Sequence, residues 1–304
     1  MVIGMINKEE RILEYINWLY SDYNDIGFKS DISKLDEVLG NFQKGRLITI
    51  FSRSGVGKST LALQIALNMM INGNKIFFGS GEMSEKEVFS KMASSYCLIK
   101  YKDIIERNLD LEEKEKIKDF ANEIINKDFY VSNKTNLREV VNEIKSYKKK
   151  FGLDVLFIDY VNKYVGGIEG NTLSEKIGVV TSVLKELALR EDICVVLLAQ
   201  ANRLVDRNVS NSICEKISEA DIQDSARIEQ DSDQLIGLYR NKKLDNKMYR
   251  DELRKSGKLN LNSKNSEVNP NCINAVILKN RHGEKGTKAL AWSGEYSRIE
   301  DIHF

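Results

Sequence analysis

The chain has 304 residues, which is enough for one large domain or two modest ones. Apolar residues make up 42% of it, so it can form a hydrophobic core. Charged residues make up 30% but nearly cancel to a net charge of +1, which excludes a strong basic field over the whole molecule, so any nucleic-acid binding needs a local patch.

The cysteines and the apolar stretches limit the class of protein further. Four cysteines lie far apart and form no Cys-x-x-Cys pair, which argues against a zinc site or a disulfide framework. Cys194 lies in an apolar run and is expected to be a buried, reduced thiol. No apolar stretch approaches membrane-spanning length. These features predict a soluble, cytoplasmic protein with no membrane partner.

The N-terminal region predicts an amphipathic helix over residues 8–20. Apolar side chains recur there at helical spacing, at Ile12, Leu13, Ile16 and Leu19. Such a helix can pack on its own domain or dock on a neighbouring subunit, and the sequence leaves both open. We expect a linker-type helix at 1–24 and a single domain at 25–304, with a further helix at 33–39.

The chain is organised around a phosphate-binding P-loop. An apolar run at 47–51 predicts the strand before it, and a helical pattern from Leu61 predicts the helix after it. The loop consists of Ser52, Arg53, Ser54, Gly55, Val56, Gly57, Lys58, Ser59 and Thr60. Small residues let backbone N–H groups surround phosphate oxygens, while Lys58 can reach the β- and γ-phosphates and Ser59 can hold Mg²⁺. Ser52 stands where the strict pattern has glycine, so a chance Gly-rich turn is the alternative.

A second strand, predicted at 75–78, leads into an acidic turn that contains Glu82. Ser84 then begins a helix, with Glu87 at the capping-box position. Further elements are predicted as helices at about 99–107, 111–126 and 137–147 and a strand at 129–131.

Two continuous apolar runs each predict a parallel strand buried on both faces. The first, 154–160, carries Asp159 near its carboxyl end, where open α/β sheets bind ligands. Asp159 is therefore predicted to be the Walker B acid, which holds Mg²⁺ directly or through water. The second run, 193–198, leads to Gln200, and a helix is predicted at 173–190 between the two. Alternating strands and helices predict a parallel sheet flanked by helices.

The C-terminal part is less regular. Residues 204–220 and 241–270 are polar, and the second stretch looks like an insertion. A strand is predicted at 234–240. The runs 273–281 and 287–292 predict a β-hairpin at the end of the domain.

Six short motifs follow one another as they do in DnaB-family replicative helicases. They are Gly81-Glu82-Met83-Ser84, Asp159-Tyr160-Val161-Asn162, Gln200-Ala201-Asn202-Arg203, Ser225-Ala226-Arg227-Ile228-Glu229-Gln230-Asp231-Ser232-Asp233, Lys279-Asn280-Arg281-His282-Gly283 and Tyr296-Ser297-Arg298. Each is weak alone, but in this order they cover roughly residues 25–300, and the chain resembles the ATPase domain of that family. The resemblance implies an α/β fold of the RecA-like P-loop NTPase type, with a mostly parallel central sheet flanked by helices and a C-terminal β-hairpin.

The resemblance also implies roles for individual residues. Glu82 would orient and deprotonate the attacking water, and Gln200 would sense the γ-phosphate. Lys279 and Arg281 would reach the γ-phosphate bound by a neighbouring subunit, and Arg240 would join the P-loop in binding nucleotide. The plainer alternatives are a helix N-terminal acid for Glu82, a polar strand end for Gln200 and a strand-face salt bridge for the two basic residues.

Loops facing a central channel would bind single-stranded DNA. By resemblance, Gln223, Asp224 and Ala226 belong to the phosphate-binding loop of the family. Gln223 replaces an arginine and Ala226 replaces a glycine, so we expect the salt-dependent part of the DNA affinity of this loop to be weaker. Arg203 either compensates for the lost charge or is a solvated loop residue.

The resemblance implies an ATP-dependent DNA helicase that uses ATP and Mg²⁺, acts on single-stranded DNA in replication and hydrolyses ATP at the subunit interfaces of a hexameric ring. A RecA/RadA-like recombination ATPase and a regulatory NTP-binding module, either a loader or a decoy without unwinding activity, are the alternatives. The N-terminal collar domain of the family is expected to be absent, which leaves open whether a helicase loader or a primase is a partner.

Overall fold

The computed structural model describes residues 8–20, 27–201, 217, 226–281 and 283–302. In these residues nine strands form one sheet, in the order β3-β2-β4-β5-β1-β6-β7-β8-β9. The strands are β1 (Leu47–Ser52), β2 (Ile76–Ser80), β3 (Phe129–Ser132), β4 (Val155–Asp159), β5 (Cys194–Gln200), β6 (Gln234–Tyr239), β7 (Cys272–Asn280), β8 (Gly286–Ser293) and β9 (Arg298–Asp301). The first six in spatial order are parallel and the last three antiparallel. The predicted α/β fold with a mostly parallel sheet is therefore confirmed.

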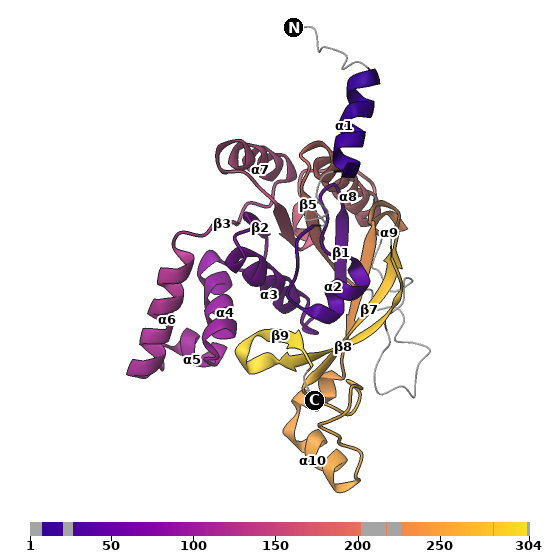
Figure 1. Ribbon diagram of the computed structural model, residues 1–304. Helices are drawn as coiled ribbons and strands as arrows, with labels where there is room; N and C mark the ends of the chain where they lie inside the picture. The colour runs from indigo at the N-terminus through magenta and orange to yellow at the C-terminus, as the bar shows by residue number, and fades with distance from the viewer. Residues whose placement is uncertain (1–7, 21–26, 202–216, 218–225, 282, 303–304) are drawn as a thin grey trace.

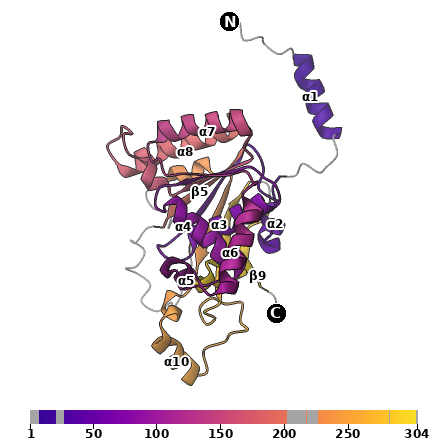
Figure 2. The same cartoon turned by 90° about the vertical axis from the view of Figure 1, so that its left-hand side faces the viewer.

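Helices cover both faces of this sheet, as Figures 1 and 2 show. The helices of more than one turn are α1 (Lys8–Tyr20), α2 (Ser33–Leu39), α3 (Lys58–Ile71), α4 (Glu85–Cys97), α5 (Tyr101–Glu106), α6 (Leu111–Ile124), α7 (Leu137–Phe151), α8 (Leu173–Arg190), α9 (Ala226–Asp231) and α10 (Lys247–Lys255). Short 3₁₀ turns lie at η1 (Val161–Tyr164), η4 (Lys242–Asp245) and η5 (Gly294–Tyr296). One core lies under α2, α3, α4 and α6, and the other lies under α7, α8 and α9.

The central strands are apolar throughout because both of their faces are covered. In β1, for example, Ile48 and Ile50 face the core under α3, whereas Leu47 and Phe51 face the core under α8. Every residue of β1, β2 and β4 is buried. Cys194 in β5 is also fully buried, and this burial raises the pKa of its thiol, as expected for a neutral core residue.

Several helix ends are fixed by side chains. The predicted capping box before α4 is present: Ser84 accepts the amide of Glu87, and the Glu87 carboxylate accepts the amide of Ser84. The N-terminus of α2 is capped instead by Asp301, whose carboxylate accepts the amides of Ser33 and Lys34 at 2.6 and 3.1 Å. The last strand of the sheet therefore stabilises the first helix of the domain.

The C-terminal strands go beyond the predicted hairpin. Strands β7 and β8 form that hairpin, and β9 pairs with β8 as a further antiparallel strand. Between β6 and β7 the polar stretch contains η4 and α10, neither of which the sequence predicted. No helix in the described ranges combines the length and apolar character that a membrane crossing requires.

Helix α1 projects beyond the domain in Figure 1 and stands apart from the rest of the chain in Figure 2. Its apolar side chains are exposed: Leu13 by 57% and Leu19 by 53%. The helix predicted over residues 8–20 is therefore present, and its apolar face is not buried on the domain.

Candidate nucleotide-binding and hydrolysis site

Four neighbouring parallel strands end at one edge of the sheet, and their last residues are polar. Ser52 of β1 is paired in register with Gln200 of β5, and Ser80 of β2 is paired with Asp159 of β4. Strands β4 and β5 are themselves neighbours, so the four ends are contiguous. The carboxyl edge of an open parallel sheet is where ligands bind. Residues that are far apart in the sequence thus meet where the predicted site requires them.

The P-loop connects β1 to α3 through backbone conformations that favour glycine. Gly55 has φ of 72° and Gly57 has φ of 132°. A Cβ atom on Gly57 would lie 2.6 Å from the ring of Trp292, so a larger residue does not fit. Helix α3 starts immediately afterwards at Lys58, and its unpaired N-terminal amides make this end a favourable position for an anion.

A cavity of about 250 Å³ opens above this loop. It is lined by residues 53–60 other than Val56, together with Glu82, Gln200 and Trp292. Ser52 and Val56 are buried beneath it. The structure therefore brings together most of the predicted nucleotide-binding loop and two of the predicted catalytic residues in a single hollow.

Lys58 and Asp159 form an ion pair beside this cavity. The Nζ atom of Lys58 lies 3.5 Å from Oδ1 of Asp159 and 5.2 Å from the centre of the Tyr160 ring. Asp159 is fully buried, and its Oδ2 atom has no hydrogen-bond partner among the described residues. An unpaired buried carboxylate oxygen suits Mg²⁺ or one of its waters. With the Ser59 hydroxyl in the cavity wall, these residues fit the predicted Mg²⁺ site.

The turn after β2 holds Glu82 at the cavity. The Ser80 hydroxyl donates to the carbonyl of Met83 at 2.7 Å. The Asn133 amide group donates to the carbonyls of Ser80 and Met83 at 2.9 and 2.7 Å. These hydrogen bonds fix the backbone on both sides of Glu82, whose side chain is exposed and lines the cavity. Sequence reasoning missed Asn133, which is an ordinary polar residue after a strand.

Arg240 lies behind the cavity rather than among the residues that line it. Its Nε atom donates to the carbonyl of Val56 at 3.1 Å, and its guanidinium lies over the Trp292 ring, 4.5 Å from the ring centre. Asp245 accepts two hydrogen bonds from it, at 2.7 and 2.9 Å. Trp292 could have been found from the sequence as an aromatic side chain at the end of a hairpin strand, whereas nothing marks Asp245 in its polar stretch.

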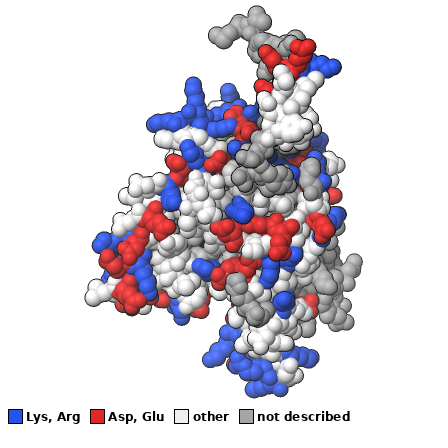
Figure 3. Space-filling view, viewed as in Figure 1, with Lys and Arg blue, Asp and Glu red and all other residues white. Residues whose placement is uncertain are grey.

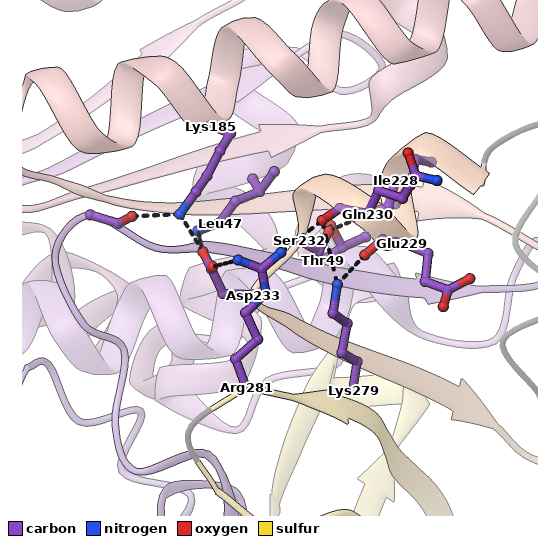
Figure 4. Close-up of polar contacts among 11 residues, drawn as sticks. Leu47, Thr49, Lys185, Ile228, Glu229, Gln230, Ser232, Asp233, Lys279 and Arg281 are labelled. Carbon is purple, nitrogen blue, oxygen red and sulfur yellow. Dashed lines mark hydrogen bonds and ion pairs between the residues drawn. The ribbon is translucent and has the colours of Figure 1, made fainter.

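Lys279 is in register with Leu235 near the start of β6, so it and Arg281 lie at the edge of the sheet opposite the carboxyl ends of the parallel strands. Figure 4 shows the polar contacts of both side chains. The guanidinium of Arg281 donates to Asp233 at 3.3 Å and to the carbonyl of Gln230 at 3.0 Å. The ammonium of Lys279 donates to the carbonyl of Glu229. Burial, and secondarily the nearby charge of Arg281, lower the pKa of Lys279. Arg281 forms the salt bridge that the sequence left as an alternative, and its side chain remains 46% exposed, whereas Lys279 has no ion pair among the described residues.

The predicted DNA-binding residues are only partly described. Ala226 is exposed and begins α9. Arg203, Gln223 and Asp224 lie outside the described residues. Their roles remain predictions from the sequence.

Comparison with known proteins gives the family. The sequence profile described as "DnaB-like helicase C terminal domain" matches residues 27–301. The chain belongs to this family. The RecA-like ATPase fold and the helicase resemblance predicted from the motifs are thereby confirmed.

Curated members of the DnaB-like family match most of this chain at low identity. The replicative DNA helicase DnaB of Helicobacter pylori is 27% identical over 91% of the chain and 59% of its own length. The replicative DNA helicase DnaC of Bacillus subtilis is 26% identical over 94% of the chain and 59% of its own length. The chain thus spans about three fifths of the length of these relatives.

Solved structures show the same DnaB-like fold. The ATPase domain of G40P superposes with a TM-score of 0.80 at 22% identity, and covers 99% of this chain and 100% of that one. A DnaB-like replicative helicase studied with primase also has a TM-score of 0.80, at 24% identity, with 98% of this chain and 69% of that one covered. The RadB recombinase has a TM-score of 0.52 at 17% identity, with 91% and 100% covered.

Proposed function

We propose that this chain is an ATP-dependent DNA helicase motor that translocates on single-stranded DNA during replication, in the cytoplasm. The observation that supports this most is the cavity in which Lys58, Ser59, Glu82 and Gln200 meet. Transfer of a phosphoryl group from a nucleotide to water requires a phosphate-binding lysine, a hydroxyl for Mg²⁺ and a residue that orients the water. These side chains match those requirements in residue type and position. Family membership supplies the link to DNA replication.

In this proposal the P-loop amides and Lys58 bind the β- and γ-phosphates of ATP. The Glu82 carboxylate accepts a proton from the attacking water and orients it. Gln200 hydrogen-bonds the γ-phosphate. Ser59 and Asp159 would hold Mg²⁺, which when bound would neutralise part of the negative charge of the phosphates.

We further propose that the active site is completed by a second copy of the chain. Lys279 and Arg281 lie at the edge of the sheet opposite the P-loop, so they do not reach the cavity of their own chain. Arginine suits a role of spreading charge over transferring phosphoryl oxygens. A homo-oligomeric ring, which we propose to be hexameric, would bring these residues to the next cavity.

DNA contact in this proposal falls to the loops around Arg203, Gln223 and Ala226, at the centre of the ring. The exposed apolar face of α1 would dock on the adjacent copy. A solved relative was studied with primase, so a primase or a loader is a proposed partner.

ATP hydrolysis measured with and without single-stranded DNA tests this function. We expect DNA to stimulate hydrolysis, and Glu82→Gln to lower the rate by at least about a hundredfold while ATP binding is kept. Glu85→Gln, an exposed acid three residues along, is the matched control and should change little.

Three other outcomes have a definite meaning. Hydrolysis that does not respond to DNA but still depends on Glu82 would favour the regulatory module. Hydrolysis that depends on neither would contradict the proposed motor. Filaments in place of rings would favour a recombination ATPase.

A further inference from the structure

The connection between β6 and β7 carries an excess of positive charge. Residues 242–264, which we call the basic segment, contain eight Lys and Arg and three Asp and Glu, a net charge of +5, whereas the whole chain has +1. The segment includes η4 and α10 and projects from the end of the molecule opposite α7 in both ribbon views (Figures 1 and 2). In Figure 3 its surface is predominantly blue.

Most of the negative charge in the basic segment is already paired. Asp245 is bound by Arg240, and Asp251 is paired with Arg254 at 3.2 Å. Five exposed lysines have no carboxylate within ion-pairing distance among the described residues: Lys243, Lys247, Lys255, Lys258 and Lys264. Helix α6 is different. On α6, Lys116 and Lys118 are paired with glutamates of the same helix.

Asparagines add hydrogen-bond donors to the same surface. The side-chain oxygens of Asn246 and Asn260 in the segment, and of Asn265 directly after it, each accept the backbone amide two residues further along the chain. Their NH₂ groups are left without a partner among the described residues, on exposed side chains. The surface therefore presents ammonium and amide donors but few acceptors. A complementary partner must be rich in acceptor oxygens and negatively charged.

The exposed apolar content of the basic segment argues against a protein partner. Only Met248 and Leu261 are large exposed apolar residues in its described part. Protein interfaces normally have an apolar core and are depleted in lysine. Contacts from lysine and asparagine side chains to phosphate oxygens are typical of nucleic-acid backbone binding.

We propose that the basic segment binds the phosphate backbone of a nucleic acid, through residues other than those assigned to the ring centre. The segment also touches the P-loop: Nζ of Lys242 donates to the carbonyl of Ser54 at 3.0 Å. This inference stands beside the proposed motor function and does not depend on it, because it concerns binding without hydrolysis.

A salt titration of DNA binding tests the proposal. Fluorescence anisotropy with a labelled duplex, without nucleotide, compares the wild type with a triple variant, Lys247→Gln, Lys255→Gln and Lys258→Gln. The control variant removes three exposed lysines from α7 at the other end of the molecule, Lys145→Gln, Lys149→Gln and Lys150→Gln. Both variants lose three positive charges. A difference in their DNA affinity therefore depends on where the lysines lie and not on the net charge.

We expect the triple variant to bind at least tenfold more weakly at low salt. The slope of log affinity against log salt should become shallower by about two to three, because each lost duplex phosphate contact contributes about 0.9. The α7 variant should match the wild type. Equal slopes for wild type and triple variant, or an equal loss in the α7 variant, would overturn the proposal. So would equally tight, lysine-dependent binding of a poly-glutamate peptide of the same charge, which would indicate an acidic protein as partner. DNA binding can be measured in this way even if the protein does not hydrolyse ATP, so the test is independent of the proposed motor function.

Discussion

Arg281 is connected to Leu47, the first residue of β1, through the carboxylate of Asp233. Asp233 accepts the Leu47 amide at 2.8 Å and the Arg281 guanidinium at 3.3 Å. Ser52, the last residue of the same strand and the first of the P-loop, comes five residues after Leu47. Along an extended strand this is a distance of about 16 Å. This distance makes Arg281 a poor candidate for the cavity of its own chain and a good one for that of a neighbour.

Asp233 is expected to be important for stability, because three groups depend on its buried carboxylate. Besides Leu47 and Arg281, it accepts the ammonium of Lys185 at 2.6 Å. Asp233→Ala would leave the buried Leu47 amide without a partner and remove the counter-charge of Lys185 and Arg281, and should lower the free energy of unfolding by about 3 kcal/mol in urea titrations. Glu106→Ala, which removes an exposed pair with Lys102, should cost less than about 1 kcal/mol. Similar losses of unfolding free energy in the two variants would contradict a stabilising role for the Asp233 carboxylate.

Trp292 is expected to contribute to nucleotide affinity. Its ring lines the cavity on one side and is packed against Arg240 on another, so it offers an apolar surface beside the P-loop. Trp292→Ala should weaken ATP binding about tenfold, with little change in the maximal rate, whereas Trp292→Phe should keep most of the affinity. Titration with a fluorescent ATP analogue measures this. Unchanged affinity in the alanine variant would remove Trp292 from the site.

The lowered pKa of Lys279 predicts a pH effect on hydrolysis. Burial and the charge of Arg281 lower this pKa, while Glu229, Asp231 and Asp233 act in the opposite direction. A lysine with a lowered pKa loses its positive charge earlier as pH rises. If Lys279 contacts the γ-phosphate, the ATPase rate should fall on the alkaline side at a pH below that expected for an ordinary lysine.

Lys279→Arg is the matched test, because arginine keeps its charge across this range. Its rate should stay high to a higher pH than that of the wild type. Identical alkaline profiles for the two proteins would argue that the Lys279 charge takes no part in hydrolysis.

The sequence predicted the strands around the candidate site where local pattern determines structure. The apolar runs before Ser52 and Asp159 are strands because both faces are buried, and parallel strands necessarily end at one edge. It did not predict β9 or α10, which have short or largely polar sequences. The cap of α2 by Asp301 and the support of Glu82 by Asn133 depend on contacts between distant residues, which no local pattern encodes.

Mixing two inactive variants tests the shared site most directly. Lys58→Ala removes the P-loop lysine and Arg281→Ala removes the residue proposed to act on the neighbour, so each protein alone should be nearly inactive. In an equal mixture of exchanging subunits, about a quarter of the interfaces would join an intact P-loop to an intact Arg281, and a corresponding part of the wild-type ATPase rate should return. A mixture of Lys58→Ala with Glu82→Gln is the control and should stay inactive, because both residues belong to the same cavity. A Lys58→Ala and Arg281→Ala mixture that is no more active than its components would contradict a site shared between subunits.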